Sequence, residues 1–461
     1  MLAFFELHAK TESPDLDEGI NRTLGMLVNK SQECEDRIQI LTEFSSLAFD
    51  LGVEIVLIEP SIIFYLLQKH QRSLLMLRGF NILDFNKSSN ILNFAIQKAS
   101  LKLILEDKFD RTMLENGFKN VYKNNTCNGI SSDEMDAIGH YFYTKDAWTI
   151  HIVEFLDMTN YLWHSALPPD LCSLLPDKKY IHFTRNDSIF ETFVAIPMND
   201  NYKISVPSNA MRFLHQMKSS KFLPCRPILQ PQEKHPREND IPFIIKEMKR
   251  IFHPHLMDFW LTSGTLLGWF RECGVISYTT DVDFGMWAAD VSDMEDLIQI
   301  IKKNYTLKLK GRFGLFIMSS DHLVPPIPLV GLQGRREVNS LYGLMLSLFV
   351  EEALEITFDY NNLRIDLFFF YDEGNQTYVV AHFSEKYSYV KVIYPPFSLC
   401  SADLLGEKVL VPCDTKKIIT TEYGPNWTER VREWDWTSSF YNKGPEIHWD
   451  SDRKKKVYQF F

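Results

Sequence analysis

The chain has 461 residues, a formal net charge of −11 and 45% hydrophobic residues. This length allows two or three domains with cores of their own, and the composition is that of an ordinary globular protein. The acidic balance argues against a nucleic-acid polymerase or a general nucleic-acid binder, because such proteins need basic surfaces. A small nucleotide-linked ligand remains compatible with this charge.

The first half of the chain alternates between helical and extended patterns. We expect residues 1–35, which are polar, to be loosely ordered. Apolar residues at helical spacing predict a helix over 37–51, and the apolar run 53–58 predicts a buried strand followed by another helix. These elements indicate a stem-like α/β domain over residues 36–217.

A proline-rich segment separates this domain from the second half. Residues 218–240 contain four prolines with charges between them, which makes this segment the best linker candidate. A helix predicted over 241–252 then opens a second domain, residues 241–461. The predicted fold class is therefore α/β, or α+β, with a mixed sheet in the second domain.

Three acidic residues in the second domain form the strongest candidate site. Asp281 and Asp283 lie two residues apart in a predicted strand, so their side chains share one face of it. Asp366 lies in the apolar run RIDLFFFY, which predicts a neighbouring strand. Such a group of carboxylates suits Mg²⁺ or Mn²⁺ bound together with substrate phosphates. We expect all three to bind metal and to serve catalysis.

A structural ion pair is the alternative for Asp366. An unpaired carboxylate in so apolar a strand would be costly, so a metal or an arginine must compensate it. Arg364 shares a strand face with Asp366 if the strand is regular, and the two could pair. Clustered acids mark functional sites often enough that we favour the metal.

A strand, a Ser-Gly turn and a helix start are predicted just before the first two acids. Backbone N–H groups at such a helix start can hold a phosphate, so Ser263, Gly264 and Thr265 are candidate phosphate-binding residues. Arg271 lies in the helix that follows, and its planar side chain suits a phosphate or one of the carboxylates. An ordinary surface arginine is the alternative.

The motifs of the second half carry a family resemblance. The stretch FWLTSGTLLGWFRECGVISYTTDVDFGMW, with LEITF, RIDLFFFY, YPPFSLC, VLVPCDT, YGPNW and EWDW, resembles the fukutin family and, more broadly, the LicD group. The resemblance extends into the first half through VEIVLIEPSIIFYLL and TNYLWHSALP. It implies a nucleotidyltransferase-like catalytic domain that transfers ribitol phosphate or phosphocholine from a CDP-linked donor to a glycan or glycoprotein.

Two other functions remain open at this point. A non-catalytic member of the family would bind glycan or act as a scaffold for a related transferase, which is also a possible partner. An ordinary nucleotidyltransferase would release pyrophosphate rather than CMP. The retained acids argue against the scaffold, which has no need of them.

Cysteines and glycosylation sequons bear on the compartment. Cys400 and Cys413 flank a predicted strand pair; a disulfide and two buried free thiols are both open, and the thiols are slightly favoured. Eight sequons favour the secretory pathway, and the family resemblance implies the Golgi lumen. The N-terminal sequence shows no apolar stretch of the length of an anchor, so we expect the natural start to lie upstream.

The two halves share a faint sequence parallel. IVLIEPSIIFYLL and FWLTSGTLLGWF both predict a strand, a turn and a helix, and the run 149–156 resembles RIDLFFFY in pattern. The first half has neither the Ser-Gly turn nor an Asp-x-Asp pair. A degenerate copy of the catalytic fold would explain this, but any α/β domain offers strand-turn-helix units.

Overall fold

The computed structural model describes most of both predicted domains. The described residues are 36–63, 90–124, 139–165, 187–189, 193–197, 202–230, 233–291, 294–304, 306–314, 353–383, 386, 388–432, 434, 439–448 and 458–460. The predicted loose segment 1–35 lies outside them. No helix within the described ranges is long and apolar enough to cross a lipid bilayer.

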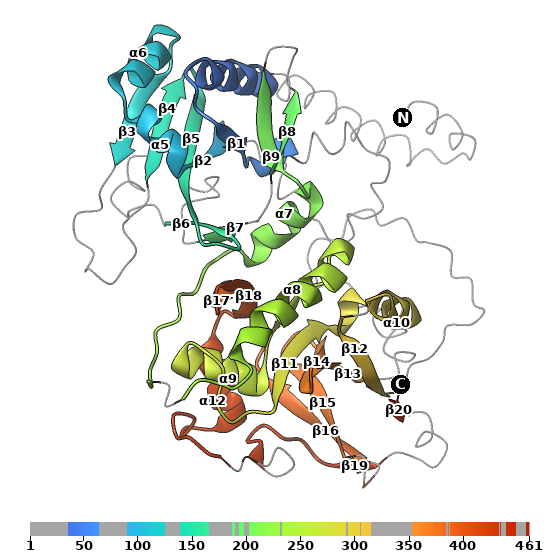
Figure 1. Ribbon diagram of the computed structural model, residues 1–461. Helices are drawn as coiled ribbons and strands as arrows, with labels where there is room; N and C mark the ends of the chain where they lie inside the picture. The colour runs from blue at the N-terminus through green and yellow to red at the C-terminus, as the bar shows by residue number, and fades with distance from the viewer. Residues whose placement is uncertain are drawn as a thin grey trace, which may run out of the picture.

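A mixed sheet forms the core of the first half (Figure 1). Its strands follow the order β3-β4-β5-β2-β1-β9-β8, with β6 and β7 attached through β5. Strands β2 and β5 are parallel, as are β1 and β9, and the other neighbours are antiparallel. The strands are β1 (Ile55–Leu57), β2 (Ile91–Gln97), β3 (Lys119–Asn124), β4 (His140–Lys145), β5 (Trp148–Asp157), β6 (Leu162–His164), β7 (Asp187–Ile189), β8 (Phe193–Pro197) and β9 (Lys203–Pro207).

Helices pack on this sheet and bury its apolar side chains. A helix over 36–50 contributes Leu41 and Phe44 to the core, which also contains Phe94 and Ile152 of the central strands. Residues 60–63 are also helical, and the other helices described in this half are α5 (Lys98–Ile104), α6 (Asp107–Glu115) and α7 (Ala210–Gln216).

The second half contains another mixed sheet, in the order β19-β16-β15-β14-β13-β12-β20, with β11 beside β14 and β10 beside β11. Its strands are β10 (Phe259–Leu261), β11 (Asp281–Trp287), β12 (Lys308–Gly314), β13 (Ala353–Tyr360), β14 (Leu363–Asp372), β15 (Thr377–Phe383), β16 (Ser388–Tyr394), β19 (Ile447–His448) and β20 (Tyr458–Phe460). Strands β17 (Leu399–Leu404) and β18 (Glu407–Pro412) form a separate hairpin. The helices are α8 (Ile241–Phe252), α9 (Ser263–Glu272), α10 (Met294–Lys302) and α12 (Thr415–Tyr423). The α/β class with a mixed second sheet is confirmed.

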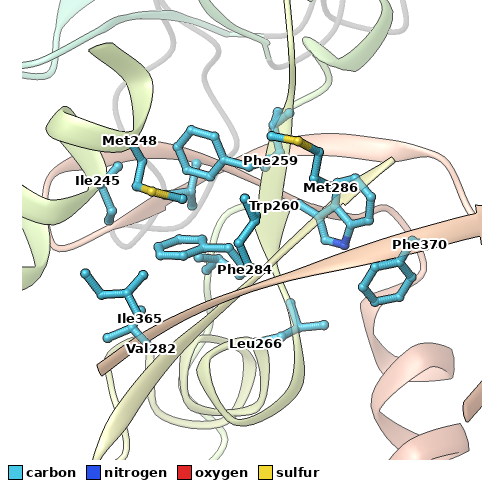
Figure 2. Close-up of a cluster of buried hydrophobic side chains, with 14 of the residues drawn as sticks. Ile245, Met248, Phe259, Trp260, Leu266, Val282, Phe284, Met286, Ile365 and Phe370 are labelled. Atoms are coloured by element: carbon cyan, nitrogen blue, oxygen red, sulfur yellow. The ribbon is translucent and has the colours of Figure 1, made fainter. Parts of the chain in front are cut away.

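The core of the second half surrounds the strands that carry the predicted acids. Helix α8 spans the predicted residues and buries one apolar face that includes Ile245 and Met248. Figure 2 shows these side chains near Phe284 of β11, with Trp260 of β10 on the opposite side of the cluster. The alternate residues of β11 and β14 thereby anchor the sheet, since neighbouring side chains on a strand point to opposite faces.

The predicted linker segment packs against the second half. Leu223 donates its N–H to the carbonyl of Ser401 at 2.8 Å, and Cys225 forms a disulfide with Cys273 at the end of α9. A second disulfide joins Cys400 and Cys413, which corrects the expectation that slightly favoured free thiols. The Cys225–Cys273 disulfide fixes the linker segment to the end of α9, and the Cys400–Cys413 disulfide joins the two ends of the β17–β18 hairpin.

Candidate functional site

Parallel pairing of β11 with β14 brings the three predicted acids together. The register places Asp283 opposite Asp366 and Asp281 opposite Arg364. One carboxylate oxygen from each of Asp281, Asp283 and Asp366 lies within 4.8 Å of the others. No other such group of acidic, histidine or cysteine ligands occurs in the described part of the chain. This separation allows one divalent cation to contact all three side chains.

The first turn of α9 orients Asp283. The N–H of Gly264 donates to Asp283 Oδ2 at 3.1 Å, and the Asp283 N–H donates to Thr265 Oγ1 at 2.8 Å. The helix begins at Ser263, so its partial positive end faces this carboxylate. This first turn therefore holds an acid of the site, and phosphate binding by Ser263, Gly264 and Thr265 stays a prediction.

An arginine links Asp366 to a further acid on β13. Arg364 Nε lies 2.8 Å from the Asp366 carboxylate, and its Nη2 lies 3.0 Å from Glu355 Oε1. Asp366 and Glu355 are buried, but the Arg364 side chain is 55% exposed. The ion pair considered from the sequence is therefore formed, and it leaves Asp366 beside Asp283. Because Arg364 is exposed to solvent, its ion pair with Asp366 does not prevent a metal ion from contacting the same carboxylate.

The buried acids of this site repel one another. Burial, followed by the charges of Asp281 and Asp366, raises the pKa of Asp283 well above its usual range. Burial and the Glu355 charge also raise the pKa of Asp366, against the opposing effect of Arg364. A divalent cation would offset both the lost hydration and the mutual repulsion. The residues present therefore fit Mg²⁺ or Mn²⁺.

Sequence reasoning missed a fourth acid near the site. Glu422 of α12 is 1% exposed and accepts a hydrogen bond from the Tyr394 hydroxyl at 2.8 Å. Burial raises its pKa to about 7, against hydrogen bonds that include one with Ser263. Its charge also contributes to the raised pKa of Asp283. The sequence signal that could have revealed Glu422 is its position directly before the motif YGPNW.

Arg271 is buried, which excludes the surface alternative, and phosphate binding by Arg271 stays a prediction. Its side chain is 1% exposed and lies 3.0 Å from Glu272 Oε1. It also donates hydrogen bonds to the carbonyls of Trp427 and Glu429, at 3.3 and 3.2 Å. Arg271 is thus neither a surface residue nor, in these contacts, a partner of the acids. It fixes the YGPNW segment to α9, and Trp427 packs on Phe270.

Two family models match the two halves of the chain. Residues 20–228 match the model described as Fukutin N-terminal. Residues 257–317 match the LicD/FKTN/FKRP nucleotidyltransferase domain, a range that contains Asp281 and Asp283 but ends before Asp366. The two models together cover most of the chain, and both describe the fukutin/LicD family. The family expected from the sequence is therefore confirmed.

Individual relatives agree with these matches. The chain is 28% identical over 347 residues to the mouse protein named ribitol-5-phosphate transferase FKTN, and 26% identical over 341 residues to its human counterpart. Each match covers 70% of this chain and 65% of the relative. A Caenorhabditis elegans protein without an assigned function is 26% identical over 272 residues, with 56% of this chain and 61% of that protein covered. The chain thus matches less than two thirds of the length of these relatives.

Proposed function

We propose that this protein is a metal-dependent transferase that moves ribitol 5-phosphate, or a similar phospho-alcohol, from a CDP-activated donor to a glycan hydroxyl. The observation that carries the proposal is the cluster of Asp281, Asp283 and Asp366 on two parallel strands. The similarity to proteins named ribitol-5-phosphate transferases selects the transferred group. The acceptor would be a glycan on a glycoprotein.

The three acids would hold Mg²⁺ or Mn²⁺ at the position of the donor pyrophosphate. The bound cation supplies neutralisation of the negative charge that develops on departing CMP. Gly264 and Thr265 keep Asp283 in place through its carboxylate and its backbone N–H. Asp366, with a raised pKa, is the residue we assign to accept the proton of the attacking glycan hydroxyl.

The proposed site of action is the Golgi lumen. The two disulfides and the sequons support an oxidising, glycosylating compartment. Asn375 and Asn426 are exposed, whereas Asn304 is only 7% exposed. We therefore expect glycans on Asn375 and Asn426 of the natural protein and none on Asn304, and glycosidase treatment with peptide mapping tests this.

Donor competition tests the reaction itself. The purified protein is incubated with CDP-ribitol, CDP-glycerol or CDP-choline, an acceptor glycan and Mg²⁺ or Mn²⁺, and CMP release is measured. We expect the fastest release from CDP-ribitol and none with EDTA. Release from CDP-choline alone would favour phosphocholine transfer, and absence of CMP release from all three donors would contradict the proposal.

A further inference from the structure

The two sheets share one strand arrangement. In the first half the order β3-β4-β5-β2-β1 contains antiparallel neighbours throughout, except for the parallel pair β2–β5. In the second half β12-β13-β14-β11-β10 repeats this order, and β11–β14 is the parallel pair. The chain visits the strands in the same sequence in both halves, from β1 to β5 and from β10 to β14.

The residue register is also the same. The parallel pairs β2–β5 and β11–β14 each contain seven residue pairs, with Asn93 opposite His151 where Asp283 is opposite Asp366. At the adjoining turn the N–H of Ile58 donates to the carbonyl of Asn93 at 3.1 Å. The N–H of Thr262 donates in the same way to the carbonyl of Asp283 at 3.3 Å.

Local irregularities coincide as well. Strands β3 and β12 each contain a bulge at the same level of the sheet, beside Phe142 and Thr357. Phe142 is the partner of His151, and Thr357 is the partner of Asp366. The two bulges lie between Asn120 and Tyr122 and between Leu309 and Gly311. Bulges are specific features of a fold, so a shared position is stronger support than shared strand order.

The hairpins that follow the central strands agree in the same detail. Asp157 accepts a hydrogen bond from the N–H of Thr159 through Oδ1 at 2.8 Å, and Asp372 accepts one from Gly374 at the same distance. Thr159 and Gly374 both have positive φ, at 76° and 83°. In both hairpins the residue after the aspartate donates its N–H to a carbonyl three residues later, at 2.9 Å. Independent sheets have no reason to share this turn.

We propose that the N-terminal half is a second copy of the catalytic fold in which a closed hydrogen-bonded chain of side chains replaces the metal site. The register assigns Asn93 to the position of Asp283, His151 to that of Asp366, and His140 to that of Glu355. No residue of this set is aspartate. The copy therefore has the scaffold of the site without its carboxylates.

The replacing side chains bond one another. Asn93 donates through Nδ2 to Glu59 Oε2 at 2.5 Å, and its Oδ1 lies 2.8 Å from Nδ1 of His151. Nε2 of His151 lies 2.9 Å from Nδ1 of His140, whose Nε2 lies 3.0 Å from the carbonyl of Ser165. Asn93, His151, His140 and Glu59 are between 0 and 2% exposed.

These hydrogen bonds occupy the histidine ring nitrogens that a cation would need. Both ring nitrogens of His140 and both of His151 already have partners, and metal binding would have to break them. Burial and the neighbouring His164 lower the pKa of His140 to about 3, and burial also lowers the pKa of His151. On this proposal the metal-dependent chemistry belongs to the second copy alone.

Manganese broadening tests whether the first site is closed. The full chain is labelled with ¹⁵N-histidine in the Asp281→Asn/Asp283→Asn background, and the imidazole signals of His140 and His151 are recorded while Mn²⁺ is added. We expect these signals to keep their intensity. Their selective loss at micromolar Mn²⁺ would overturn the proposal, because it would place a metal in the first site.

This result is separable from the proposed function. A wild-type chain that binds no Mn²⁺ would contradict the transferase proposal, yet it would leave the closed first site intact. The duplication has a test of its own in an experimental structure of the full chain. Superposing the two sheets should pair Asn93 with Asp283 and His151 with Asp366, and a shift of one residue in either pairing would overturn the assignment of the copy.

Discussion

The two halves of this chain share one strand arrangement but have different side chains at the equivalent positions. At one level of the sheet, the second half has Asp283 beside Asp366, and the first half has Asn93 beside His151. The acids repel one another, whereas the amide and the imidazole form a hydrogen bond with one another. The comparison shows that this scaffold fixes where the side chains meet but not what they do there.

The turn after the first strand explains part of the difference. In the second half, the N–H of Gly264 holds the Asp283 carboxylate. The first half has Pro60 at the equivalent position, and proline has no N–H to donate. Its neighbour Glu59 instead accepts hydrogen bonds from the backbone and side chain of Asn93. A carboxylate at position 93 would meet Glu59 rather than a donor.

The sharpest test of the comparison removes one acid of the second site. Asp283→Asn should lower CMP release at least about 100-fold, since loss of a metal ligand disrupts the geometry of such a site. The fold should remain, because the amide oxygen can still accept from Gly264. Release assays at matched Mn²⁺ check this, with the exposed Asp414→Asn as control. Near-normal turnover in Asp283→Asn would remove these acids from catalysis.

Replacing Asp366 separates its two roles. Asp366→Asn keeps the shape of the side chain but removes its charge, so we expect a large loss of rate. The melting temperature without metal should hold or rise, because repulsion with Asp283 is relieved and the exposed Arg364 pair contributes at most about 1 kcal/mol. Calorimetry in EDTA measures this. Marked destabilisation would instead identify a structural ion pair.

The matching change in the first half should affect stability and spare catalysis. His151→Leu leaves Asn93 Oδ1 and His140 Nδ1 without their partner, at a cost of about 2–4 kcal/mol in unfolding free energy. CMP release per folded molecule should be unchanged. Chemical denaturation and activity below the transition provide both measurements, with the exposed His255→Leu as control. A catalytic loss in well-folded His151→Leu would show that the first site takes part in the reaction.

The two sites should also respond to pH with opposite signs. The pKa of His140 is lowered from 6.5 to about 3, so its contribution is present above pH 6.5 and is lost as pH falls toward 3, by up to about 1.4 kcal/mol per pH unit. The pKa of Asp283 is raised, so its contribution without metal is present at low pH and is lost as pH rises through the raised value.

Two variants isolate these opposite responses. In EDTA, the destabilisation caused by His151→Leu should shrink as pH falls below 6.5, because His151 has a lowered pKa as well. The stability of Asp283→Asn relative to wild type should grow as pH rises from about 4 to 8. Denaturation curves at several pH values measure both differences. Parallel pH trends for the two variants would contradict the contrast between the sites.

The sequence predicted the elements and acids of the second site because both are local signals. Strand alternation placed Asp281 and Asp283 on one face, and the apolar run around Asp366 marked its strand. Arg271 and Glu422 could not be placed in this way, since their partners lie in distant segments. The Cys225–Cys273 disulfide was missed for the same reason.

The duplication was only a faint pattern in the sequence because the defining residues had changed. Asn93 and Asp283 have different chemistry, and so do His140 and Glu355. Strand register and bulges are relations between distant segments, so a single strand pattern does not contain them. The parallel between the runs 149–156 and RIDLFFFY was therefore visible, but the equivalence of His151 and Asp366 required the sheet.

The smallest expected effect lies where the first copy contacts the second half. The Tyr161 hydroxyl donates to Asp403 Oδ2 at 3.0 Å, and the carbonyl of Asp403 accepts from Trp269 Nε1 of α9 at 2.8 Å. Tyr161→Phe should cost about 1–2 kcal/mol, because it removes a buried hydrogen bond to a carboxylate. Denaturation measures this cost, and CMP release at saturating donor should change less than about threefold.

The equivalent position in the other hairpin supplies a matched control for this contact. Gln376 stands where Tyr161 stands in the first copy, and its side chain donates to Glu373 of its own hairpin. Gln376→Ala should therefore leave both stability and activity near wild type. If Tyr161→Phe were as silent as Gln376→Ala, the contact would not support α9. If Tyr161→Phe abolished turnover without loss of stability, the contact from the first copy would position α9 for catalysis.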